Sequence, residues 1–214
     1  MRARKFKKKM PSNYAELLQY PFYKEMEKGA LIYVHIPKNA GTSIARALEM
    51  PRSGGKPDIK KHYPADQIQM AIDPDLWANA FRFCFVRNPW DRTFSHYRYR
   101  VRKGRIDEES HRDSFEVWLR YEFQERRRAK NNLRPQLHWI RNTEGVVDMS
   151  FIGRFERLQE DFAHICDHFQ IQASLPHKLA SHPKLDYRDQ YTEEMAAIVQ
   201  EFFREDIEYF GYRF

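Results

Sequence analysis

The chain has 214 residues, of which 42% are hydrophobic and 31% charged. This composition is typical of a globular protein. A chain of this length can form one domain with a sizeable core but is too short for two. There is no run of 18 or more apolar residues, which excludes a transmembrane helix. A net charge of +7 favours anionic partners, but the sequence lacks the zinc-ligand, helix-turn-helix and aromatic signatures of nucleic-acid-binding domains.

The first segment is strongly basic, MRARKFKKKM, and Pro11 follows where a signal peptide would have its apolar region. We therefore expect a solvated, disordered tail. From Tyr14 to Lys28 apolar residues recur at helical spacing, which predicts a helix broken at Pro21 and ended by Gly29. We divide the chain into a basic tail with a leading helix, residues 1–29, and a single domain, residues 30–214.

The next segment, LIYVHIPKNAGTSIARA, predicts a strand, a tight loop and a helix. Leu31 to Val34 are apolar and rich in residues that favour strands, and Pro37 ends the strand because it has no N–H for a central ladder. Gly41 permits a tight turn and a close backbone approach to a ligand. Thr42 and Ser43 are expected to cap the helix, which continues to about Met50.

This arrangement predicts an anion site, because a helix start presents free N–H groups and a positive dipole end. Lys38 adds a mobile positive charge. The loop is not a Walker A motif, in which the lysine follows the second glycine, since Lys38 precedes Gly41. A cradle for phosphate or sulfate is therefore favoured over a nucleotide kinase.

A second strand is predicted at Phe81–Val86, FRFCFV, which has few polar breaks and should be buried on both faces. Asn88 is a strong helix cap and Pro89 suits the first helical position. The helix that follows should run to about Lys103, with Gly104 ending it.

Other elements are read from the same signals. A flexible loop over the site is expected at 51–57. A third strand is predicted at 146–152. Further helices are predicted at 65–72, 112–128, 155–169 and 192–210, with a helical turn at 73–77, a turn at 134–136 and a polar loop at 176–188.

Strands separated by helices predict an α/β protein, a P-loop-like three-layer α/β/α sandwich with a short, mostly parallel central sheet. Ligands of such folds bind beyond the carboxyl ends of the strands. The segments 35–38 and 86–89 should therefore face one cleft. The cysteines Cys84 and Cys166 lie in apolar contexts, and we expect two buried thiols in a reducing cytoplasm.

Two motifs resemble those of sulfotransferases that use 3′-phosphoadenosine 5′-phosphosulfate (PAPS). Pro37-Lys38-x-Ala-Gly-Thr-Ser resembles their 5′-phosphosulfate loop, and Phe85 to Arg92 with Ser95 resembles their 3′-phosphate-binding strand and helix. The nearest subgroup is the carbohydrate sulfotransferase-like group, sulfotransferase family 2. Less specific blocks at 135–136, 151–162 and 206–212 extend the resemblance over residues 30–212.

The resemblance implies transfer of a sulfuryl group from PAPS to a hydroxyl or amine of an acceptor, which we expect to be a carbohydrate. The product would be 3′-phosphoadenosine 5′-phosphate, and no metal is needed. Lys38 would stabilise the leaving group. The cofactor would be held at its 5′ end by Pro37, Lys38, Asn39, Ala40, Gly41, Thr42 and Ser43, and at its 3′-phosphate by Arg87 and Ser95.

Arg87 can form a charge-assisted fork to a phosphate, although a salt bridge is an equally ordinary use of such an arginine. Ser95 lies about two helical turns further on, so its hydroxyl reaches the same phosphate only if the strand end folds back.

An alcohol acceptor also needs a general base, and His62 is the first choice. Histidine has a suitable pKa, and the position resembles that of a histidine in related bacterial sequences. Lys60 and Lys61 should lower the pKa of His62 and keep it neutral. A plain surface histidine is the competing interpretation, and His138 is the second candidate base.

Two other functions stay open. A nucleotide-dependent phosphotransferase of the same fold would need Mg²⁺ ligands near the loop, and no convincing acid follows an apolar strand. A non-catalytic polyanion-binding module would use the basic stretch Arg98–Arg134, which is otherwise a solvated face or part of the acceptor site. The sequence names neither the acceptor nor the oligomeric state.

Overall fold

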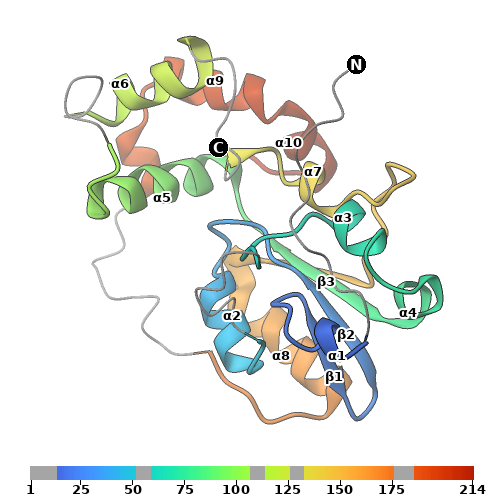
Figure 1. The fold of residues 1–214 in the computed structure, drawn as a ribbon. Coiled ribbons are helices and arrows are strands. Elements are labelled where there is room, and N and C mark those ends of the chain that lie inside the picture. The colour runs from blue at the N-terminus through green and yellow to red at the C-terminus, as the bar shows by residue number, and fades with distance from the viewer. Residues whose placement is uncertain (1–13, 52–58, 107–113, 126–132, 176–185) are drawn as a thin grey trace.

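A four-stranded sheet in the order β1-β2-β3-β4 forms the centre of the computed structural model (Figure 1). Its strands are β1 (Tyr23–Met26), β2 (Gly29–Val34), β3 (Phe81–Val86) and β4 (Phe151–Arg154). β1 is antiparallel to β2, whereas β2, β3 and β4 are parallel. The sheet is thus mostly parallel and the chain is an α/β protein, as predicted.

The structure describes residues 14–51, 59–106, 114–125, 133–175 and 186–214. The expectations for the basic tail at 1–12, for most of the loop at 51–57, for the basic end of the helix at 112–128 and for most of the loop at 176–188 lie outside these residues.

Side chains that alternate along the strands enter two separate cores. Phe83 and Phe85 of β3 pack on one face with α2 (Gly41–Ala47) and α8 (Leu158–Phe169). Cys84 and Val86 point into the other core. The helices that contribute to this second core are α3 (Ala65–Gln69), α4 (Pro74–Asn79), α5 (Pro89–Arg102), α6 (Phe115–Arg120), α7 (Leu137–Ile140), α9 (Glu193–Phe202) and α10 (Arg204–Phe210), together with the short α1 (Tyr14–Leu17).

Several local predictions are confirmed. β3 has the predicted bounds, and four of its residues are fully buried. Asn88 caps α5 by accepting a hydrogen bond from the backbone N–H of Trp90 at 3.0 Å, and Pro89 is the first helical residue. Both cysteines are free and buried. Among the described helices, none combines the length and the apolar character that a membrane span requires.

The helix predicted from Tyr14 to Lys28 forms only at Tyr14–Leu17. α1 ends at Leu17, and the chain then forms β1, which pairs with β2 through a tight turn before Gly29. Gly29 has φ 114°, a conformation that glycine adopts without strain. Pairing with β2 satisfies the backbone of this segment, so tertiary contact overrides the helical spacing of its apolar residues.

The third strand was placed too early, at 146–152, because Val146 and Val147 favour strands. Val147 forms only an isolated bridge with Arg141, and Val146 is exposed. The ladder with β3 starts at Phe151.

The last helix was predicted as one element from 192 to 210 but is divided. Thr192 caps α9 as expected, yet the helix stops at Phe202 and α10 starts at Arg204. The residue between them, Phe203, leaves helical geometry with φ −106° and buries its ring. Two other predicted helices change type along their length: α6 is followed by a π-helical turn at Tyr121–Glu125, and α8 is preceded by a 3₁₀ turn at Phe155–Arg157.

Candidate functional site

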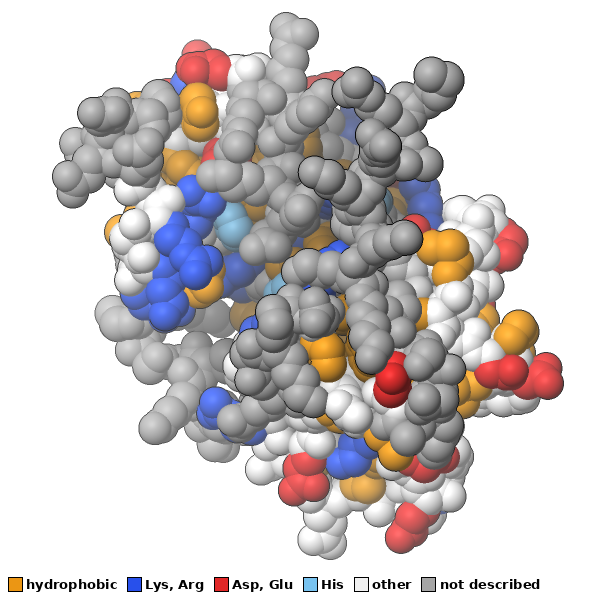
Figure 2. All heavy atoms as spheres, in the orientation of Figure 1, with side chains coloured by type: hydrophobic (Ala, Val, Ile, Leu, Met, Phe, Trp, Pro, Cys, Tyr) orange, Lys and Arg blue, Asp and Glu red, His pale blue; other side chains and the backbone are white. Residues whose placement is uncertain are grey.

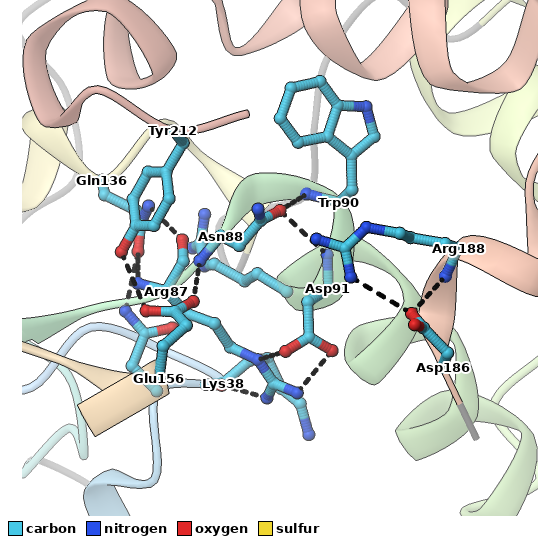
Figure 3. Close-up of polar contacts among 12 residues, drawn as sticks. Lys38, Arg87, Asn88, Trp90, Asp91, Gln136, Glu156, Asp186, Arg188 and Tyr212 are labelled. Atoms are coloured by element: carbon cyan, nitrogen blue, oxygen red, sulfur yellow. Dashed lines mark hydrogen bonds and ion pairs between the residues drawn. The ribbon is translucent and has the colours of Figure 1, made fainter. Parts of the chain in front are cut away.

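The segments that follow β2 and β3 meet at the carboxyl edge of the sheet, as the sequence predicted. Arg87, directly after β3, donates a hydrogen bond from Nη1 to the carbonyl oxygen of Lys38 at 3.0 Å. Figure 3 shows Lys38 and Arg87 side by side at this point. The edge therefore brings together a lysine and an arginine that are 49 residues apart in sequence.

The loop after β2 has an unusual backbone. Lys38 (φ 75°) and Ala40 (φ 60°) both adopt the left-handed conformation, which disfavours residues with a Cβ. Asn39, between them, is fully buried and donates from Nδ2 to the carbonyl oxygen of Phe85 and to Oε1 of Gln136. Such strain persists only where the surroundings fix the conformation. The two buried hydrogen bonds of Asn39 constrain the loop in this way.

The start of α2 differs from the prediction. Ala40 is the N-cap residue, and Thr42 and Ser43 lie inside the first turn, so neither caps the helix. The left-handed turn at Ala40 brings its carbonyl to the N–H of Ser43 at 2.8 Å and closes the turn without a side-chain cap. The first N–H groups of a helix have no acceptor within the helix, so this end can receive an anion.

Gly41 is required by close packing within the chain. A Cβ at this position would lie 1.8 Å from Nε2 of His35, a separation that no neighbouring atom tolerates. The His35 ring is buried, stacks on Tyr33 and contacts the ring of His62 at 4.3 Å between centroids. The glycine thus lets a buried histidine pack directly under the loop.

Lys38 has a half-buried side chain whose Nζ lies 4.3 Å from the centroid of the Tyr99 ring. Burial, together with the smaller effects of the positive charges of Arg87, Arg102 and Lys61, lowers the pKa of Lys38 to about 8. The amine is therefore protonated at pH 7 but lies in a positive potential, which an anion would relieve.

Arg87 is already paired in the structure. Its Nε and Nη2 donate to the two carboxylate oxygens of Asp91 at 2.7 and 2.8 Å (Figure 3). Its guanidinium also lies 3.8 Å from the centroid of the Phe155 ring. Ser95 is half-buried on α5, one turn after Asp91 and one turn before Tyr99. Residues four apart share a helix face, so Ser95 lies on the face that carries the Arg87 and Lys38 contacts.

His62 reaches the site through the segment before α3. Its Nδ1 lies 2.9 Å from the carbonyl oxygen of His35. A carbonyl can only accept, so Nδ1 carries the proton and Nε2 keeps a free lone pair. Burial lowers the pKa of His62 to about 4, with smaller contributions in the same direction from Lys61 and Arg92. The predicted direction of the shift is confirmed, with burial as its main cause.

The neighbouring Lys61 contacts the loop itself, since its Nζ donates to Oγ1 of Thr42 at 2.7 Å. His138 is different. Its exposed ring lies beside Arg134, whose Nη1 donates to Nε2 of His138 at 2.7 Å. That bond occupies the lone pair a base would use, which favours His62 on geometric grounds.

A buried polar network behind the loop was not predicted from the sequence. Gln136 accepts from Asn39 and from the backbone N–H of Arg87 through Oε1, and returns a bond from Nε2 to the Arg87 carbonyl. The carboxylate of Asp206 accepts from the backbone N–H groups of Gln136 and Leu137. Figure 3 shows Gln136 against the backbone of Arg87.

Arg92 completes this support. Its side chain is fully buried, Nε donates to the carbonyl oxygen of Pro37 at 3.1 Å, and Nη1 donates to that of Arg134 at 2.9 Å. Burial lowers the pKa of Arg92 to about 10, and the charge of Asp206 opposes the shift. In the sequence, Gln136, Asp206 and Arg92 were visible only as polar side chains within a motif or block. Their partners are too distant along the chain to be inferred.

Comparisons with known proteins identify the family of the chain. No curated protein matches the chain. A crystal structure of a sulfotransferase from Alicyclobacillus acidocaldarius is 17% identical, with a TM-score of 0.44, and the match covers 93% of this chain and 81% of that one. A family model described as the sulfotransferase family matches residues 24–213. The chain therefore belongs to the sulfotransferase family.

Proposed function

We propose that the protein transfers a sulfuryl group from PAPS to a hydroxyl or amine of an acceptor, most naturally a carbohydrate. The observation that carries this proposal is the meeting of Lys38, the uncapped start of α2 and Arg87 at one edge of the sheet. PAPS is anionic at both ends, and cations with free N–H groups are what such a ligand requires.

The residues fit the donor as follows. The loop from Pro37 to Ser43 would take the 5′-phosphosulfate, since its helix start has no side-chain cap and its lysine is partly buried. Arg87 and Ser95 would take the 3′-phosphate. In this assignment the phosphate contacts the outer N–H groups of Arg87 while Asp91 holds the guanidinium in place.

The chemistry is an in-line displacement at sulfur. The acceptor oxygen attacks the sulfur, the bond from sulfur to the phosphate oxygen breaks, and Nε2 of His62 takes the acceptor proton. The Lys38 ammonium offsets the charge that develops on the departing phosphate oxygen. Positioning and charge stabilisation dominate such transfers. Two buried free thiols suit a reducing compartment, and we place the enzyme in the cytoplasm as part of the proposal.

Calorimetric titration with nucleotides tests the donor. We expect 3′-phosphoadenosine 5′-phosphate to bind more tightly than 5′-AMP, which lacks the 3′-phosphate, and ATP with Mg²⁺ to bind weakly. Tight binding of ATP with Mg²⁺ and no preference for the bisphosphate would instead support the phosphotransferase. Absence of nucleotide binding, with retention on an anionic polysaccharide, would support the polyanion-binding module.

The same titration with Arg87→Ala tests the 3′-phosphate assignment. Loss of a charged hydrogen bond is worth roughly 1.5–3 kcal/mol, or about 10- to 100-fold in affinity. Because Arg87 also holds the Lys38 carbonyl, a purely structural role would weaken both nucleotides equally. A role at the 3′-phosphate weakens the bisphosphate and leaves 5′-AMP unchanged. Ser95→Ala, which has no such structural bond to Lys38, is the matched variant.

A further inference from the structure

The ring of Tyr99 is the shared neighbour of three cations. Nζ of Lys38 lies 4.3 Å from the ring centroid, and the guanidinium carbons of Arg102 and Arg105 lie 5.8 and 5.9 Å from it. Within the part of the chain that the structure describes, no carboxylate forms an ion pair with any of the three. Among the described residues, the Lys38 ammonium therefore rests against the aromatic face of Tyr99 and not against a carboxylate.

The contrast with Arg87 is direct. The positive charge of Arg87 is matched by both oxygens of Asp91, whereas that of Lys38 is opposed by nearby cations, Arg102 among them. Like charges around one ring make the resting place of Lys38 favourable but weak. An arriving phosphate or sulfate would compete for its ammonium successfully, because a charge-assisted hydrogen bond is stronger than contact with a ring face.

The constraints on Lys38 act on its backbone and not on its side-chain torsions. The left-handed turn and the bond from Arg87 to the Lys38 carbonyl hold the main chain. The side chain has four rotatable carbon–carbon bonds, so the ammonium can leave the ring without any change in the loop.

We propose that Tyr99 is a positioning residue for Lys38: its ring holds the ammonium beside the loop in the ligand-free protein and releases it to the anionic end of the bound donor. This inference rests on the proposed function only for the identity of the anion. The holding of Lys38 by Tyr99 concerns the free protein and can be tested without any ligand.

The test uses NMR of the full chain after reductive ¹³C-dimethylation of its lysines, which preserves their positive charge. Methyl groups above an aromatic face resonate upfield, and the Lys38 signal is assigned by its absence in Lys38→Arg. We expect an upfield Lys38 signal in the wild type and in Tyr99→Phe, and its return to the normal lysine position in Tyr99→Leu. Tyr209→Leu, which removes an exposed tyrosine on α10, is the control and should leave the signal unchanged.

Adding 3′-phosphoadenosine 5′-phosphate tests the release. The upfield shift should disappear as the ligand saturates the protein, in the wild type and in Tyr99→Phe alike. An unchanged Lys38 signal in folded Tyr99→Leu overturns the holding. A persistent upfield signal with the bisphosphate bound overturns the release. If the bisphosphate does not bind at all, the proposed donor is wrong, whereas the ligand-free comparison still decides the role of Tyr99.

Discussion

His62 is distinguished from the other histidines near the site by one hydrogen bond. The bond from Nδ1 to the His35 carbonyl fixes the tautomer and leaves Nε2 as an acceptor. In His138 the corresponding lone pair is occupied by Arg134, and His35 is buried beneath Gly41. Among the three, His62 combines a free lone pair with a position beside the loop.

The pH dependence of turnover should reflect this difference. Because the pKa of His62 is lowered to about 4 and that of Lys38 to about 8, kcat/KM should fall below about pH 4, as His62 gains a proton, and above about pH 8, as Lys38 loses its charge. The profile of kcat/KM reports such groups in the free enzyme. Lys38→Arg should move the alkaline limb upward, since arginine stays protonated.

The base itself is tested by His62→Ala and His138→Ala side by side. We expect kcat to fall about 10²- to 10⁴-fold in His62→Ala, with nearly normal bisphosphate affinity because the proposed base would touch the acceptor and not the nucleotide. A collapse of turnover in His138→Ala with normal turnover in His62→Ala would assign the role to His138.

Single residues were predictable where their chemistry is local. The order of Lys38 and Gly41 excluded a Walker A loop without any structure. The capping role of Thr42 and Ser43 was wrong because Asn39, held by Phe85 and Gln136, fixes the turn one step earlier than the sequence suggests. The same long-range contacts hide the packing of His35 on Gly41.

At the scale of elements, predictions succeeded where two local signals coincided. β3 has an apolar run of strand-favouring residues broken only by Arg82, and α5 has both a capping asparagine and a proline at its first position. They failed where pairing with a distant segment decides the outcome, as in β1, which the antiparallel ladder with β2 holds in strand geometry. The division between α9 and α10 has a similar cause, since it buries Phe203.

The break between α9 and α10 also places the first turn of α10 against the network behind the loop. Asp206, in the first turn of α10, accepts hydrogen bonds from the backbone N–H groups of residues 136 and 137. Its negative charge also raises the pKa of the buried Arg92, which favours the charged form. Asp206→Ala should lower the free energy of unfolding by about 1–3 kcal/mol for each of the two buried backbone N–H groups that lose their acceptor. Asp206→Asn should cost less, since the amide oxygen still accepts.

Urea unfolding measures these changes. Glu205→Ala is the matched control. Glu205 is next to Asp206 in sequence, but its carboxylate makes an exposed ion pair with Arg141, and such pairs are worth about 0–1 kcal/mol. Equal losses in Asp206→Ala and Glu205→Ala would show that the buried network does not support the fold.

At the scale of the whole molecule, the α/β class and the edge of the sheet that carries the site followed from the order of strands and helices. The support that α10 gives to the loop did not, because Asp206 contacts Gln136, and Gln136 contacts Asn39, only through tertiary packing.

The positive charge of the molecule is unevenly distributed. Figure 2 shows lysine and arginine side chains gathered over the C-terminal end of α5, where Arg98, Arg102, Lys103 and Arg105 are exposed. Arg120, further along the same basic stretch, is paired with Glu116 and Glu194. Among the described residues of the stretch from Arg98 to Arg134, the cations near Lys38 form an unpaired part, with no ion pair to a carboxylate, whereas Arg120 is neutralised by two carboxylates.

We expect the unpaired part to hold an anionic acceptor. Binding of a sulfated polysaccharide probe should weaken steeply with salt, since exposed charges are screened beyond about 8 Å at physiological ionic strength. Arg102→Gln with Arg105→Gln should reduce both the affinity and its salt dependence, whereas Arg120→Gln, whose charge is already compensated, should change neither. The measurement is the dissociation constant of the probe at several salt concentrations for the three proteins. Equal behaviour of all three would mean that the exposed arginines form only a solvated face and that the acceptor is recognised through uncharged groups.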